Sequence, residues 1–146
     1  MNTTSGARTL LLGLDVGTTA TKALLVDVDG NVVASATQSY ELLTPQPGWV
    51  EQDPEALWRA VLTVVRDVVA QKGPKDRIVA LSQASQGGTT IPIDAAGIPT
   101  YRAISWMDTR AETQATELET QLTADEVRTI TGWPLGPTLS LQHLRW

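Results

Sequence analysis

The sequence predicts an α/β fold, and three observations support it. An apolar, β-rich stretch over residues 10–27 is interrupted by a polar turn at Gly17-Thr18-Thr19, and a further β-rich segment follows at residues 31–40. From Pro54 onward, apolar residues recur at the spacing of an amphipathic helix, namely Leu57, Val61, Val64, Val65 and Val68. Residues 78–82 form a short apolar run, typical of a strand buried inside a sheet. We therefore expect three antiparallel strands, a helix that packs on the sheet and a further strand.

Turn and helix signals define the ends of these elements. Asp29-Gly30 is a two-residue turn signal before the third strand. Prolines and a glycine within residues 43–49 predict an irregular loop over the surface. Asp53-Pro54 has the residue types of a helix N-cap and first helical position, and Lys72-Gly73-Pro74 ends the helix.

The second half of the chain contains shorter predicted elements. Strands are expected at residues 89–94, with an edge or bulge at Pro92, and at 102–106, with a turn at 94–97 after the first. A polar helix at 110–122 follows. A short helix then starts with a capping box at 123–126 and ends near Gly132, and an amphipathic helix starts at residue 138. This last helix has no stop signal before Trp146, so we expect the chain to be cut there. His143 is expected to be a partly exposed residue of that helix.

Composition excludes several classes of protein. The chain has 146 residues, of which 42% are apolar, and this favours a single domain with a substantial core. A net charge of −5 without a basic stripe argues against a nucleic-acid partner. The polar first nine residues lack a signal peptide, and no apolar run reaches the length of a membrane span. With no cysteine in the sequence, a cytoplasmic protein without a membrane partner is expected.

The turn after the first strand has the chemistry of a phosphate site. Gly17 allows a ligand to approach the backbone closely, and the amides and hydroxyls of Thr18 and Thr19 can donate to phosphate oxygens. Lys22, expected to be a buried lysine near the turn, adds a positive charge. The carboxylate of Asp15 would repel a bare phosphate, so it fits this set if a hard cation such as Mg²⁺ lies between them. The alternative is an ordinary hairpin turn that Asp15 caps.

Three motifs, in order along the chain, carry a family resemblance. They are Gly13-Leu14-Asp15-Val16-Gly17-Thr18-Thr19-x-x-Lys22, then Gly48-Trp49-Val50-Glu51-Gln52-Asp53-Pro54, and finally Ala103-Ile104-Ser105-Trp106-Met107-Asp108-Thr109-Arg110. The chain resembles the first part of the FGGY carbohydrate kinases, whose members are several times longer. The resemblance implies an incomplete ribonuclease-H-like lobe of the actin/hexokinase-type ATPases, with a mixed sheet and flanking helices. Residues 1–8 would then be a flexible tail, and residues 9–146 the truncated N-terminal portion of the lobe.

The resemblance also implies roles for the residues of the first motif. Asp15 would be the catalytic and metal-binding carboxylate, close to Mg²⁺ and to the transferred phosphoryl group. Gly17, Thr18, Thr19 and Lys22 would bind the phosphates of ATP, the expected cofactor together with Mg²⁺. The glycerol kinases of the family have Arg at the position of Lys22, and Lys cannot bind phosphate in their bidentate manner.

Sugar contacts are implied for Gln86, Gly87, Gly88, Trp106 and Asp108. The xylulose kinases have Gln-Met-His-Gly in the first segment, so the two glycines leave room for a larger polyol but supply no side-chain donor. The alternative for this segment is a flexible turn. Trp106 could stack on the sugar, or fill the core at a strand end. Asp108 could bind hydroxyls together with Arg110, or the two could pair with each other or cap the next helix.

Three functions remain open. In the first, the chain is part of an ATP-dependent kinase for a ketopentose or related polyol, with xylulose preferred and gluconate as a close alternative. The family's catalytic base and adenine pocket lie outside these residues, so the fragment alone is expected to be inactive and to need the remainder of the kinase chain. The second is a non-metabolic ATPase of the actin and chaperone superfamily, and the third is a truncated, non-catalytic module. A small sugar or polyol is the expected ligand, and a homo-oligomer is left open.

Overall fold

The computed structural model describes residues 6–146, which fall into two compact units. Within the described residues, the first unit comprises residues 6–41 and Glu55–Ser85, and the second comprises Leu42–Pro54 and Gln86–Trp146. Of the tail predicted at residues 1–8, residues 1–5 lie outside the described residues. Arg8 is held in place, because its side chain donates to Asp76 Oδ2 at 2.6 Å and 3.1 Å.

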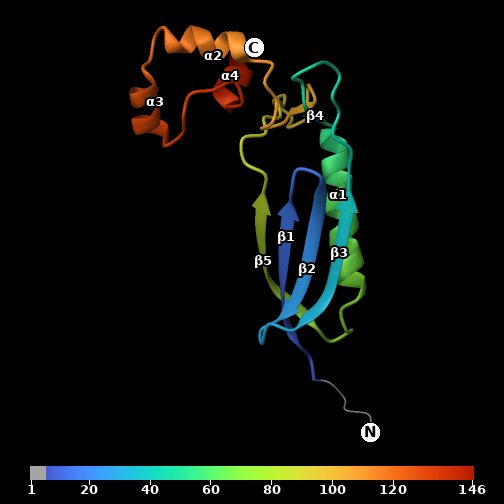
Figure 1. Cartoon of the computed structure of the whole chain (residues 1–146). Coiled ribbons are helices and arrows are strands. Elements are labelled where there is room, and N and C mark those ends of the chain that lie inside the picture. Colours follow the sequence, from blue (N-terminus) through green and yellow to red (C-terminus); the bar gives the residue numbers. More distant parts are fainter. Residues whose placement is uncertain (1–5) are drawn as a thin grey trace. The chain divides into compact units, whose positions relative to one another are not determined.

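A mixed four-stranded sheet forms the first unit (Figure 1). Its strands are β1 (Thr9–Val16), β2 (Ala20–Asp27), β3 (Val32–Ser39) and β5 (Arg77–Ser85), in the spatial order β3-β2-β1-β5. The pairs β1/β2 and β2/β3 are antiparallel, whereas β1 and β5 are parallel. The three antiparallel strands and the later fourth strand are therefore confirmed.

One face of this sheet packs against α1 (Pro54–Ala70). Alternate residues of β1 and β2 point to that face, as a strand geometry requires. The buried core consists of Leu10, Leu12, Leu14, Ala23, Leu25, Ala34, Val64 and Val68. The predicted helix thus begins at Pro54, directly after Asp53, and its apolar stripe faces the sheet as expected.

The prediction for the fourth strand is wrong in two respects. β5 extends through Ser85, so part of the polar stretch after residue 82 is strand. The strand is also exposed: Val79 and Leu81 each retain 57% of their surface. The physical reason is its position, because β5 is at the edge of the described sheet and pairs only with β1 there.

The second unit contains little sheet. β4 (Glu51–Gln52) pairs in antiparallel fashion with β6 (Ala103–Ile104), and isolated bridges join Thr90 to Ile104 and Ile93 to Pro99. The strands predicted at residues 89–94 and 102–106 are therefore too long. Pro92 has no amide to donate to a ladder, which limits regular pairing in its segment.

Three short helices complete the second unit: α2 (Glu112–Glu119), α3 (Ala124–Thr131) and α4 (Ser140–Arg145). The predicted capping box between Thr123 and Glu126 is present, and Gly132 ends α3 with a φ of +74°. The helix predicted at residues 110–122 is shorter at both ends. At its start, the Arg110 amide donates to Asp108 Oδ1 at 2.8 Å, and this local turn competes with the first helical turn.

His143 corrects another prediction, because it is 4% exposed and therefore buried. Its Nε2 lies 3.4 Å from the Asp108 carbonyl oxygen, and burial lowers its pKa. Within residues 6–146, no helix combines the length and the apolar character that crossing a membrane requires.

Candidate functional site

The turn between β1 and β2 is closed by a backbone hydrogen bond. The Gly17 amide donates to the Ala20 carbonyl at 3.0 Å. A Cβ atom at Gly17 would lie only 3.1 Å from that same oxygen, so the turn leaves little room for a side chain. The predicted strand, polar turn and strand are confirmed, and the close approach explains why glycine occupies position 17.

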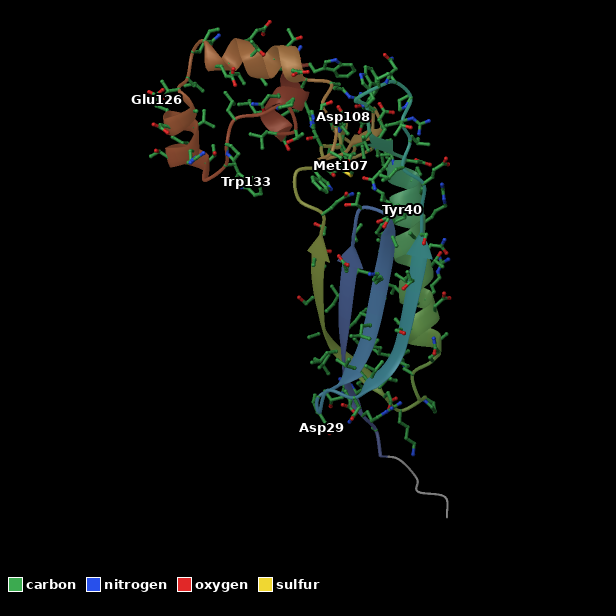
Figure 2. All side chains as sticks on the ribbon, viewed as in Figure 1. Asp29, Tyr40, Met107, Asp108, Glu126 and Trp133 are labelled. Carbon is green, nitrogen blue, oxygen red and sulfur yellow. The ribbon has the colours of Figure 1, made fainter. Side chains whose placement is uncertain are left out.

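Tyr40 holds this turn from the end of β3 (Figure 2). Its phenol Oη donates to the Gly17 carbonyl, and its backbone amide donates to the Thr19 carbonyl at 3.2 Å. The hydroxyl of Thr21, which is fully buried, donates to Tyr40 Oη at 3.5 Å. Burial raises the pKa of Tyr40, which keeps the phenol protonated as a donor. Sequence reasoning missed this residue, because no local pattern relates it to a turn 23 residues earlier.

Asp15 and Lys22 face each other across the β1/β2 pair. They are register partners, so their side chains lie on the same face of the sheet, opposite the buried face that carries Leu14 and Ala23. Both are exposed, which corrects the expectation that Lys22 is buried. They line a hollow of about 420 Å³. The hollow's other lining residues include small ones, namely Gly13, Ala23, Ser35, Ala36 and Thr37.

This hollow could bind a cation through the single carboxylate of Asp15, together with groups of a bound nucleotide. No group of three or more His, Asp or Glu side chains suited to a metal occurs among the residues that the structure describes. Asp15 is instead a single exposed carboxylate. Mg²⁺ is commonly held by one or two carboxylates together with substrate phosphates and water, so this residue fits a metal that arrives with a nucleotide.

The Gln86–Gly88 segment and Trp106 are brought together in the second unit. The Trp106 amide donates to Thr89 Oγ1 at 3.3 Å, and a Cβ atom at Gly88 would lie 3.2 Å from the Trp106 Cβ. Gly88 also has a φ of +76°, a conformation that favours glycine. Gly87, by contrast, has open space around it. Trp106 is 45% exposed, so the alternative in which it fills the core is wrong.

Gln86 offers a polar atom next to this segment. Its Nε2 donates to Gln52 Oε1 at 2.8 Å, and Gln52 is 1% exposed. Its own Oε1 is buried and has no hydrogen-bond partner within the described part of the chain. Buried acceptors in proteins are normally hydrogen-bonded, so this atom is a candidate to accept from a hydroxyl or an amide.

Asp108 is fully buried, and its carboxylate is occupied by protein groups. Oδ2 accepts from the Val50 amide at 2.6 Å, and Arg110 donates to both oxygens through Nε and Nη2 at 2.9 Å and 2.7 Å. Burial raises the pKa of this carboxyl, but the hydrogen bonds from Arg110 and Val50 outweigh it, and the net shift is downward. The geometry favours the alternative in which Asp108 pairs with Arg110 over direct contact with a sugar.

Arg110 connects the second and third sequence motifs. Its side chain is fully buried and donates to Glu51 Oε1 at 2.8 Å. The guanidinium stacks 3.8 Å from the ring centre of Trp49 and 4.9 Å from that of Trp146. Residues of the two motifs also meet through the backbone, since the Thr109 amide donates to the Gly48 carbonyl at 2.8 Å. The buried residues of the two motifs thus form one framework, and the exposed Trp106 belongs to the third motif.

Comparison with known proteins agrees with this architecture. Residues 10–146 match the family model of the FGGY family of carbohydrate kinases, N-terminal domain. The chain is 38% identical over 138 residues to a glycerol kinase of Burkholderia pseudomallei, a match that covers 93% of this chain and 28% of that protein.

Solved structures show the same relationship. A xylulose kinase from Rhodospirillum rubrum aligns with a TM-score of 0.89 at 28% identity, over 94% of this chain and 28% of that one. A Plasmodium falciparum glycerol kinase with ADP aligns with a TM-score of 0.88 at 27% identity, over 97% and 29% of the two chains. The chain thus spans between a quarter and a third of the length of these relatives.

The fold and the motifs define a lobe of the ribonuclease-H-like, actin/hexokinase-type architecture, with a mixed sheet and flanking helices, which confirms the predicted fold class. The chain belongs to the FGGY family of carbohydrate kinases and matches the N-terminal domain of that family.

Proposed function

We propose that this chain is the N-terminal domain of an ATP-dependent kinase that phosphorylates a ketopentose or related polyol, with xylulose as the preferred substrate. The observation that carries the proposal is the Gly17–Thr19 turn, which Tyr40 holds by hydrogen bonds, next to the exposed pair Asp15 and Lys22 in a chain of the FGGY family. This set combines phosphate donors, a positive charge and one carboxylate suited to a metal ion.

Each residue of the first motif has a distinct role in this proposal. Gly17 lets the nucleotide phosphates approach the backbone, and Thr18 and Thr19 donate hydrogen bonds to them. Lys22 neutralises part of their charge. Asp15 holds Mg²⁺. When bound, the ion stabilises the charge that develops on the transferred phosphoryl group.

The second unit supplies the groups for a polyol. The half-exposed ring of Trp106 offers a flat apolar surface for the C–H groups of a sugar. The unpartnered Gln86 Oε1 can accept a hydrogen bond from a hydroxyl. Open space at Gly87 leaves room for a polyol larger than glycerol, and this feature supports a ketopentose.

Glycerol is the second candidate substrate, because the Burkholderia pseudomallei protein that is 38% identical to this chain is a glycerol kinase. The FGGY resemblance implies that the catalytic base lies in a later segment of the kinase. We therefore expect the 146-residue chain alone to show no sugar phosphorylation.

The test is a coupled assay with ATP and a panel of xylulose, gluconate and glycerol, run on a complete kinase that contains this domain and on the chain alone. The complete enzyme should turn over, with the highest kcat/KM for xylulose, and the Asp15→Asn variant should be strongly impaired. Preference for glycerol would contradict the substrate assignment only. ATP hydrolysis without a phosphorylated sugar would favour the non-metabolic ATPase, and no turnover of any kind would favour a non-catalytic module.

A further inference from the structure

We propose that Tyr40 is a positioning residue that fixes the conformation of the Gly17–Thr19 turn and thereby sets its affinity for nucleotide phosphates. The inference rests on the proposed function of this turn. It concerns a residue that lies outside the three family motifs and directly after β3, whereas the turn lies between β1 and β2.

Tyr40 restrains the turn at two carbonyl groups. Its phenol donates to the Gly17 carbonyl, and its amide donates to the Thr19 carbonyl at 3.2 Å. All described peptide bonds are trans, and in a planar trans peptide the C=O and N–H groups point in opposite directions. The bond to the Gly17 carbonyl therefore also fixes the direction of the Thr18 N–H, which points away from Tyr40.

Thr21 gives the phenol a defined orientation. Its side chain is fully buried on β2, and its hydroxyl donates to Tyr40 Oη at 3.5 Å. Because Oη accepts this bond, its own proton is directed to the Gly17 carbonyl. The chain of bonds runs from Thr21 through Tyr40 to the turn, and hydrogen bonds in such chains strengthen one another.

The turn needs this restraint because of its composition. Glycine at position 17 populates more backbone conformations than any other residue type. A phosphate site gains affinity when its donors are held in place before the ligand binds, because less ordering is required on binding. Loss of the phenol hydroxyl should thus weaken nucleotide binding without altering any group that contacts the sugar.

The decisive variant is Tyr40→Phe, which removes one oxygen and retains the ring. In the 146-residue chain, amide hydrogen exchange should accelerate about fivefold to tenfold at Gly17, whose N–H is bonded to the Ala20 carbonyl, and at position 40, whose N–H is bonded to the Thr19 carbonyl, as expected for the loss of one stabilising hydrogen bond. In the complete kinase, KM for ATP should rise by about the same factor. The values of kcat and of KM for the sugar should stay within about twofold, a split that a general loss of stability would not produce.

Tyr101→Phe is the matched control. Tyr101 is the other tyrosine of the sequence, and its hydroxyl bonds to Glu51 Oε1 at 3.2 Å in the second unit. This variant loses the same atom and one hydrogen bond, yet exchange at the turn and KM for ATP should not change. Thr21→Val should move both quantities in the direction of Tyr40→Phe, and should add little in the double variant because the chain of bonds is already broken.

The measurements distinguish a failure of the Tyr40 inference from a failure of the proposed kinase function. Unchanged exchange and unchanged KM for ATP in Tyr40→Phe would overturn the inference while leaving the kinase proposal intact. An equal rise in both KM values would also overturn it. If the complete wild-type protein shows no ATP-dependent phosphorylation, the proposed function fails. Accelerated exchange in the variant would then assign Tyr40 a role in turn structure alone, which contradicts its role in nucleotide binding.

Discussion

The Arg110 guanidinium donates a 2.8 Å hydrogen bond to the Glu51 carboxylate, and their side chains are 0% and 4% exposed. The two residues are 59 positions apart in the sequence. Arg110 also donates to Asp108 at 2.7 Å, so one buried cation compensates two carboxylates. A buried ion pair is costly to desolvate, and removal of one partner leaves an uncompensated charge in the interior.

Arg110→Met should therefore destabilise the second unit strongly. The free energy of unfolding should fall by about 3 to 5 kcal/mol, because Asp108 would lose its cation and Glu51 would lose its buried one. Urea denaturation followed by tryptophan fluorescence measures the change. Arg102→Met is the control: Arg102 lies 3.6 Å from Glu51 but its side chain is 51% exposed, so its loss should cost less than about 1 kcal/mol. Equal losses in the two variants would contradict the buried framework.

Acid should weaken the contact between Arg8 and Asp76. Hydrogen bonds from the Arg8 side chain, followed by those from the Arg8 and Gly73 amides, hold the pKa of Asp76 well below its usual range. Because the folded state lowers this pKa, the stabilisation is present above the ordinary carboxyl pKa of about 3.9 and is lost as the pH falls below it.

Asp76→Asn tests this dependence, since the variant cannot titrate at that position. Between about pH 5 and pH 2, its free energy of unfolding should fall less steeply with acid than that of the wild type. Asp67→Asn changes an exposed carboxylate of α1 and should keep the wild-type slope. Parallel slopes in the wild type and Asp76→Asn would show that the contact does not contribute.

Gly48 is required by two independent constraints. Its φ is +81°, and a Cβ atom there would lie 2.7 Å from Thr109 Oγ1. Gly48→Ala should cost about 2 to 3 kcal/mol, of which about 1 to 2 kcal/mol is the left-handed backbone. Gly97→Ala has a similar φ of +80° with open space, so it should show the backbone cost alone. Addition of Thr109→Ala should recover only part of the difference between the two, as measured by urea denaturation, because it also removes the 3.2 Å hydrogen bond from Thr109 Oγ1 to the Gly48 carbonyl.

Three substitutions in the complete kinase should have separable kinetic effects. Asp15→Asn should lower kcat by about a hundredfold or more, because it removes charge stabilisation in the transition state. Lys22→Ala should mainly raise KM for ATP, since a charge on the phosphates acts in the ground state as well. Trp106→Ala should raise KM for the sugar alone. Normal turnover in Asp15→Asn, or a change in KM for ATP in Trp106→Ala, would refute the assigned roles.

The sheet face opposite α1 should promote self-association of the isolated chain. Leu11 and Leu24 point to that face and are 37% and 42% exposed. Exposed apolar patches favour association, so sedimentation should show a concentration-dependent increase in mass. Leu24→Lys should reduce it, whereas Val28→Lys, at a 63% exposed position beyond the end of β2, should have little effect. A monomer at high concentration would contradict the prediction.

The sequence by itself was sufficient for the local elements. The apolar, β-rich run that starts at residue 10, the helical spacing after Pro54 and the capping box at Thr123 each depend on neighbours within a few positions, and the structure confirms all three. The Gly17-Thr18-Thr19 turn was also predictable, because strand, turn and strand are continuous in the chain. The motifs were sufficient to identify the family, which the family model confirms.

Only the tertiary structure decided which residues are buried and with whom they pair. The apolar run at residues 78–82 predicts a buried strand, but its exposure depends on its edge position in the sheet. The sequence left open whether Asp108 pairs with Arg110 or binds hydroxyls, and it carries no local sign of the bond from the Val50 amide. It likewise carries no sign that His143 is buried. Tyr40 reaches the turn across 23 residues and Arg110 reaches Glu51 across 59. Such contacts depend on how distant segments pack, and local patterns in a single sequence do not encode that packing.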